Sequence, residues 1–272
     1  MPDNPRVAML IDCDNISWRW VKPIVGEAAL HGVLSVKRGY GDWTSSYLSG
    51  WLDELPRYAI QPVQQFAYAV GKNASDSALI IDAMDLLYAG DVDIFCIVSS
   101  DSDFTRLAMR LRESGKAVYG IGAVKTPLAF QNACDRFTFI EVLLGKAVRS
   151  VDGSPVPVDE QQQRPDTTQA EASAESSGDQ GAQEEVTADS VPDIKDVIVP
   201  AIEATSSDNG WAILSAVGSY IVNNNPSFDS RNYGYPRLGQ LVRDLKFVTV
   251  KEIADDNGMS QLWVRRKATR KR

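Results

Sequence analysis

The first half of the chain alternates short apolar runs with longer stretches whose apolar residues recur at helical spacing. The short runs predict strands at 7–12, 33–40, 62–68, 93–100, 117–122 and 137–142. The longer stretches predict helices at 17–30, 44–55, 75–89, 103–114 and 127–134. Alternation of this kind is typical of an α/β domain with a mostly parallel sheet and helices on both faces.

The last 80 or so residues follow a different pattern. Apolar residues at helical spacing predict three helices, at 193–206, 211–224 and 235–245. The stretch 247–266 predicts a β-hairpin, with "DNG" supplying the turn. Three helices followed by a hairpin predict a small winged-helix domain.

The charge is distributed unevenly and marks the domain boundaries. The whole chain has a net charge of −8, whereas residues 151–190 alone carry −9. This segment is rich in Pro, Ser, Gln and Glu and contains few aliphatic side chains, so it buries too little surface to offset the entropy of ordering. We therefore expect domains at 1–150 and 191–272, joined by a disordered acidic linker at 151–190.

Cysteine usage and hydropathy indicate the cellular setting. The chain has three cysteines, which are widely spaced and flanked by apolar residues, so neither a disulfide framework nor a zinc cluster is predicted. No run of 18 apolar residues and no secretion signal is present. The sequence thus predicts a cytoplasmic protein that does not associate with membranes.

Polar side chains, most of them carboxylates, follow the predicted strands at one edge of the sheet. They are Asp12, Asp14 and Asn15 after the first strand, Asp76 in the first turn of a helix, and Ser99, Asp101 and Asp103 after the fourth strand. In a parallel sheet, ligands bind outside the carboxyl ends of the strands. A single Asp at such a place is most often a helix cap, but several from distant segments indicate a shared site.

The chemistry of these side chains favours a hard cation. Oxygen ligands without histidine suit Mg²⁺ or Mn²⁺, which bind through a few carboxylates together with substrate phosphate. Asp82 is a second-tier candidate, because six residues of helix separate it from Asp76 by about 9 Å. Lys72 and Lys125 lie in loops predicted at the same edge, where they could contact a phosphodiester or simply be solvated.

Four motifs in this half resemble the NYN domain, a branch of the PIN-like nucleases that includes the LabA-like proteins. They are "LIDCDN", "KNASDSALIIDAMD", "IVSSDSDF" and "VYGIGAVKTP". The resemblance implies a Rossmann-like nuclease in which acidic residues bind Mg²⁺ or Mn²⁺ to hydrolyse RNA. Carried over position by position, it implies that Asp12, Asp76 and Asp101 bind the metal, and that Asn15 and Asp103 support them.

The last domain has its own resemblance. The series "AILSAVGSYIVNNNPSFDSRNYGYPRLGQLV" resembles the LOTUS domain, also called OST-HTH, an RNA-binding module. Cations and an aromatic residue could meet phosphates and stacked bases. The candidates are Arg231, Tyr233, Arg237, Arg243 and Lys246, with the basic tail "RRKATRKR".

Three functions follow from these patterns. The first is a metal-dependent ribonuclease with RNA as its partner, and the second is a non-catalytic RNA-binding protein with the same fold. The third is a haloacid-dehalogenase-like phosphatase, since "DCDN" offers a D-x-D motif with Asp12 as nucleophile, although Ile16 and the "KNASDS" stretch disfavour it. The sequence leaves open whether the chain forms a homo-oligomer.

Overall fold

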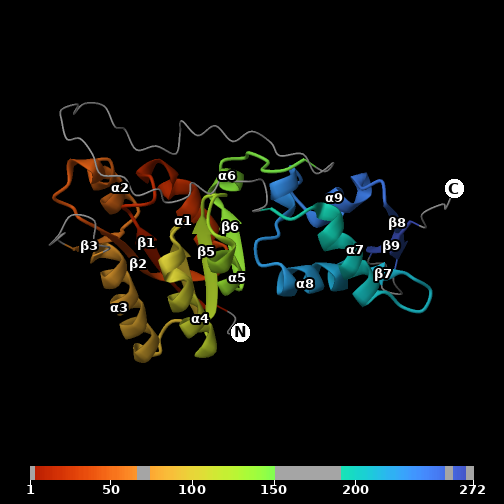
Figure 1. Cartoon of the computed structure of the whole chain (residues 1–272), viewed down its shortest axis with the longest axis horizontal. Helices are drawn as coiled ribbons and strands as arrows, with labels where there is room; N and C mark the ends of the chain where they lie inside the picture. The colour runs from red at the N-terminus through yellow and green to blue at the C-terminus, as the bar shows by residue number, and fades with distance from the viewer. Residues whose placement is uncertain (1–3, 66–73, 151–190, 255–259, 268–272) are drawn as a thin grey trace, which may run out of the picture.

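The chain forms two domains that lie side by side (Figure 1). The structure is a computed structural model, and it describes residues 4–65, 74–150, 191–254 and 260–267. The N-terminal domain is built on a six-stranded sheet, whereas the C-terminal domain combines helices with a three-stranded sheet.

All six strands of the N-terminal sheet are parallel, in the order β3-β2-β1-β4-β5-β6. Their bounds are β1 Arg6–Asp12, β2 Val33–Gly41, β3 Gln61–Gln64, β4 Ile94–Val98, β5 Ala117–Gly122 and β6 Arg136–Phe139. β1 and β4 are buried on both faces, which their nearly continuous apolar sequences require. The strand order reverses between β1 and β4, and this is where open sheets of this type bind ligands.

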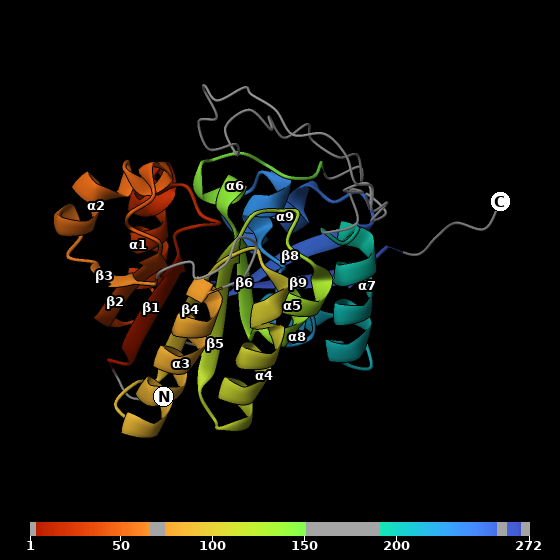
Figure 2. The same cartoon turned by 60° about the vertical axis from the view of Figure 1, so that its left-hand side comes forward.

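Helices cover both faces of this sheet, as the sequence predicts (Figure 2). One face packs against α1 Val21–Ala29 and α2 Trp51–Arg57, and the other against α3 Ala74–Ala89, α4 Thr105–Glu113 and α5 Leu128–Ala133. Short helical turns complete the domain: η1 Trp18–Trp20, η2 Ser46–Leu48, η3 Ser102–Phe104 and α6 Ile140–Leu143. Along β1, Met9 and Ile11 face the first group of helices, whereas Ala8 and Leu10 face the second.

Two predicted strands differ from the observed ones. The strand expected at 137–142 ends at Phe139, and residues 140–143 form α6 instead. The helical turn places the Glu141 side chain near the loop after β5. There both of its carboxylate oxygens accept the Val124 N–H, each at 3.1 Å. The strand expected at 62–68 is observed as β3, and its last three residues lie outside the described part of the chain.

The C-terminal domain has the predicted order of helices followed by a hairpin. Its elements are α7 Ile194–Thr205, β7 Ala212–Ile213, α8 Leu214–Asn224, η6 Ser230–Tyr233, α9 Leu238–Asp244, β8 Val248–Ala254 and β9 Ser260–Arg266. The helix predicted at 211–224 starts only at Leu214, because the two residues before it pair with β9. The sheet order is β7-β9-β8, which with the helices gives a winged helix. The predicted "DNG" turn lies outside the described residues.

Polar contacts join the two domains. The Phe137 N–H donates to the Pro226 carbonyl at 2.8 Å. The N–H groups of Val148 and Arg149 both donate to the Asn232 carbonyl, at 2.8 and 2.9 Å. The sequence pattern gave no sign of these contacts, which connect residues far apart in the chain.

Candidate metal centre at the edge of the sheet

The two central strands bring the first polar side chains together. Ile11 of β1 pairs with Val98 of β4, so the residues that follow, Asp12 and Ser99, leave the sheet side by side. Both side chains are buried, with 1% and 0% exposure. The register of a parallel pair therefore fixes the base of the site.

Asp12 is held by hydrogen bonds on one side of its carboxylate. Its Oδ2 accepts from the Ser99 hydroxyl and from the Asn15 side-chain amide, both at 2.7 Å. Within the part of the chain that the structure describes, its Oδ1 accepts a single longer bond of 3.3 Å, from the Asn15 N–H. Burial raises the pKa of Asp12, and the hydrogen bonds from Ser99 and Asn15 partly offset that rise.

Three further carboxylates converge in front of this base. Oxygen atoms of Asp76, Asp101 and Asp103 all lie within 4.8 Å of one another. Asp76 comes from the first turn of α3 and is 7% exposed, whereas Asp101 is half-buried and Asp103 is exposed. Burial raises the pKa of Asp76 to about 6, and the charges of Asp12, Asp101 and Asp103 add to the rise. This cluster could bind a metal ion, which would relieve the repulsion between the carboxylates.

The loop after β4 is pinned from several directions. The Asp101 carboxylate caps η3 by accepting from the Asp103 N–H at 2.9 Å, and the Asp101 N–H donates to the Ser99 hydroxyl at 3.1 Å. On the other side, the Ser100 hydroxyl accepts from the Ala123 N–H at 2.9 Å. Gly122 lies against this loop so closely that a Cβ there would sit 2.5 Å from the Ser99 carbonyl oxygen. Glycine is therefore required for the observed geometry.

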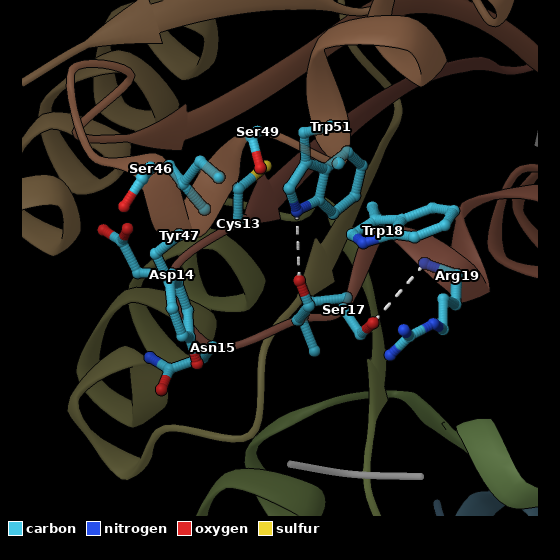
Figure 3. A pocket seen from close by; sticks show the side chains of 13 residues that line it. Cys13, Asp14, Asn15, Ser17, Trp18, Arg19, Ser46, Tyr47, Ser49 and Trp51 are labelled. Atoms are coloured by element: carbon cyan, nitrogen blue, oxygen red, sulfur yellow. Dashed lines mark hydrogen bonds between the residues drawn. The ribbon is translucent and has the colours of Figure 1, made fainter. Parts of the chain in front are cut away.

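A cavity of about 270 Å³ lies between the loop after β1 and the segment 46–51 (Figure 3). Its wall continues from the loop after β1, with Asp14 and Asn15 on one side and Trp18 and Arg19 on the other. Tyr47 closes it next to Asp14. Burial raises the pKa of the Tyr47 phenol, and the charge of Asp14 adds to the rise. The cavity thus brings aromatic, cationic and acidic groups together along the loop that follows Asp12.

The chain matches the models of two known domain families. Residues 6–141, half of the chain, match the family model of the NYN domain. The chain belongs to the NYN family. Residues 189–259 match the OST-HTH/LOTUS domain, so both resemblances drawn from the sequence are confirmed.

Solved structures similar to parts of this NYN protein include three from bacteria. A protein of unknown function from Vibrio parahaemolyticus is 19% identical, with a TM-score of 0.41, over 50% of this chain and 93% of that one. An uncharacterized protein from Nitrosomonas europaea is 26% identical, with a TM-score of 0.28, over 38% and 97%. A protein fragment from Chromobacterium violaceum is 46% identical, with a TM-score of 0.24, over 27% and 78%. No curated protein matches the chain.

The NYN domain brings most of the predicted acidic residues to one edge, but it groups them differently. Asp103, expected to play a supporting part, lies in the triad, whereas the Asp12 carboxylate is bound by Ser99 and Asn15. The assignment of Asp12 to the metal stays a prediction. Lys125 is exposed in the loop after β5, and Lys72 lies outside the described residues.

Asp82 has a structural role in the NYN domain. Its carboxylate accepts from the hydroxyl of Tyr40, which is fully buried, at 2.6 Å and pairs with Arg38 at 2.8 Å. These contacts join α3 to β2. The helix-rise argument, which separated Asp82 from Asp76, agrees with this placement.

The candidate RNA contacts of the OST-HTH/LOTUS domain divide into two groups. Arg231 is paired with Glu27 and Asp229, and Arg243 with Glu252. Tyr233 is 3% exposed, and its hydroxyl donates to the Pro192 carbonyl at 2.7 Å. Arg237 and Lys246 are exposed.

Sequence reasoning missed Trp211, Lys251 and Trp263 of this domain, and it counted Arg265 only as part of the basic tail. These four side chains meet through the register of β7, β9 and β8. The signal that could have found them is the alternation along "LWVRR", which places Trp263 and Arg265 on one face of a strand.

The described part of the chain contains no helix that is long and apolar enough to span a membrane. Its three cysteines are all buried and free.

Proposed function

We propose that the protein is a metal-dependent ribonuclease whose C-terminal domain binds RNA. The observation that carries the proposal is the convergence of Asp76, Asp101 and Asp103 within 4.8 Å at the carboxyl edge of a parallel sheet. Such a cluster is unfavourable without a compensating cation, and the raised pKa of Asp76 expresses this. The family match supports a nuclease over other uses of the fold.

The donor set fits Mg²⁺ or Mn²⁺. All its side-chain donors are carboxylate oxygens, and thiols and imidazoles do not contribute to it. When bound, such a cation supplies positive charge to the phosphate and lowers the pKa of a water that attacks in line. Asp76, Asp101 and Asp103 would hold it, and we extend the proposed ligand set to Asp12 through its less occupied Oδ1.

The residues around the carboxylates position them. Ser99 and Asn15 fix Asp12 by donating to its Oδ2, so its Oδ1 carries only the longer bond from the Asn15 N–H among the described residues. The Ser99 hydroxyl also accepts from the Asp101 N–H, so one side chain sets the relative position of two carboxylates. Lys125, exposed at the same edge, is suited to neutralise a phosphate of the substrate.

The C-terminal domain is proposed to bind the RNA and raise its concentration near the metal centre. Its family match supports a role in nucleic-acid binding. Since Arg231 and Tyr233 are engaged within the protein, we assign binding to other side chains of this domain. Free buried cysteines agree with a cytoplasmic location.

The test is to incubate purified protein with labelled RNAs in Mg²⁺, Mn²⁺ or EDTA. A product ladder that depends on metal supports the proposal. Asp101→Asn should abolish cleavage while the fold is kept, because it removes a charge and keeps the side-chain shape. Asp85→Asn is the matched control, since it removes an exposed carboxylate from α3. RNA binding without any metal-dependent cleavage would instead favour a non-catalytic RNA-binding protein.

A further inference from the structure

The outward face of the C-terminal sheet carries aromatic and basic side chains. Val264 of β9 is fully buried, so its neighbours Trp263 and Arg265 point to the opposite face. On β8, Lys251 pairs directly with Trp263. Trp211 stands just before β7, whose pairing with β9 brings it beside Arg265. We call these four residues the outer patch.

Within the outer patch, two cations meet one indole ring. The Lys251 ammonium lies 4.1 Å from the ring centroid of Trp211 and 5.7 Å from that of Trp263. The Arg265 guanidinium lies 4.7 Å from the centroid of Trp211. Cation–π attraction holds them there, but it also concentrates two positive charges in a small area.

These two cations have no carboxylate partner among the described residues. Other arginines of the domain do: Arg231 pairs with Glu27, Arg243 with Glu252, and Arg266 with Glu203. Adjacent like charges repel each other, and an anion placed between them would relieve that repulsion. The two cations of the outer patch are therefore open to an external anion.

A hollow of about 440 Å³ lies next to the patch, along the outer strand β8. Its lining includes Lys251 and Lys267, and also Arg243, whose charge is paired with Glu252. The positive groups thus continue from the two tryptophans along the edge of the sheet. A negatively charged chain could follow this path, whereas a small anion would use only part of it.

We infer that the outer patch binds single-stranded RNA, with a base stacked on Trp263 and phosphates against Lys251 and Arg265, the two cations that Trp211 holds in place. The inference rests on the proposed function in taking RNA as the ligand. Single strands are favoured because a flat aromatic surface needs the face of a base, which a duplex keeps stacked inside. Stacking of this kind tolerates any base, so the patch should select for strandedness more than for sequence.

The test measures binding without cleavage. The full chain is titrated into a fluorescein-labelled oligouridine in EDTA, and Kd is read from anisotropy. The variants are Trp263→Leu and the double change Lys251→Gln with Arg265→Gln. The control is Lys195→Gln, which removes one exposed positive charge from α7 of the same domain. Thermal unfolding confirms that each variant is folded.

We expect Trp263→Leu to weaken binding about tenfold, as the loss of one stacked base does. The double change at Lys251 and Arg265 removes two phosphate contacts, so it should lower the slope of log Kd against log salt concentration by about 1.4. The control should bind like the wild type, and an RNA duplex should bind more weakly than the single strand.

Two results would overturn the inference. One is folded patch variants that bind single strands as tightly as the control does. The other is that the patch variants lose as much affinity for an RNA duplex as for a single strand, which would indicate general charge attraction. Both are independent of catalysis, because the assay contains EDTA. If the patch variants lose binding but the wild type never cleaves RNA, the proposed function fails while the inference stands.

Discussion

Arg231 of the C-terminal domain donates two hydrogen bonds to the carboxylate of Glu27 in the N-terminal domain, at 3.0 and 2.9 Å. Glu27 is 7% exposed, whereas Arg231 is shared with Asp229 at 2.7 Å. The pair is therefore asymmetric. Without Arg231 the buried carboxylate loses its charge partner, but without Glu27 the arginine keeps one.

This asymmetry predicts unequal costs of mutation. Arg231→Gln should lower the free energy of unfolding by about 3 kcal/mol, since it leaves a buried charge unpaired. Glu27→Gln should cost about 1 kcal/mol, because Arg231 retains Asp229. Urea denaturation of both single variants and of the double variant measures the costs and their coupling. Equal costs would show that the buried position of Glu27 does not matter.

The raised pKa of Asp76 predicts a pH-dependent effect on stability in the absence of metal. A folded-state pKa of about 6, above the ordinary 3.8, means that the folded protein holds this proton more tightly than the unfolded chain. The unfolding free energy should thus fall as the pH rises through this window. Asp76→Asn removes the cost of ionising this carboxyl in the folded protein. In EDTA the variant should therefore melt a few degrees higher than the wild type at pH 8 and should show no such gain at pH 4. A lower melting temperature at pH 8 would contradict the assignment.

Asp82→Asn should separate stability from activity. The change removes the charge that pairs with Arg38 and weakens the acceptor for the buried Tyr40 hydroxyl. We expect a loss of about 1 to 2 kcal/mol in unfolding free energy with cleavage retained at saturating metal. The comparison is with Asp101→Asn, which should show the reverse. Loss of cleavage in both variants, with the fold of each intact, would place Asp82 in the metal centre.

Gly122→Ala should disturb the metal centre although Gly122 is not one of its proposed ligands. The added methyl group would lie 2.5 Å from the Ser99 carbonyl oxygen, and Ser99 bonds both Asp12 and Asp101. We expect weaker Mn²⁺ binding by calorimetry and a destabilisation of about 1 to 3 kcal/mol. Gly26→Ala in α1 is the control, since nothing lies within 4 Å of its Cβ position. Wild-type Mn²⁺ affinity in Gly122→Ala would mean that the loop adapts freely.

The pattern of apolar residues was sufficient to predict β1, β4 and α3. Each of these elements is buried through its own apolar residues, so its sequence alone carries the signal. The pattern was also sufficient to place the acidic residues at one edge, since parallel strands end together. It failed at α6, where the bond between Glu141 and Val124 overrides a strand-like pattern. That bond joins segments 17 residues apart, and a local pattern carries no trace of it.

The finer grouping of side chains was less predictable for the same reason. The distances among Asp76, Asp101 and Asp103 depend on how α3 and η3 sit against the strands. The meeting of Lys251 with Trp211 depends on the register of β7, β9 and β8. The pairing of Arg231 with Glu27 depends on the docking of two domains, which no motif encodes.

The contact between Arg149 and Val191 has a consequence for how this protein can vary. The Arg149 guanidinium donates to the Val191 carbonyl, so the chain leaves the N-terminal domain and enters the next at adjoining points. For a disordered linker of the kind the sequence predicts, doubling the length of such a closed loop costs only about 0.6 kcal/mol. Lineages could therefore lengthen, shorten or rewrite residues 151–190 while the docked pair stays as it is, which makes this segment the natural place for new regulatory sequence to accumulate.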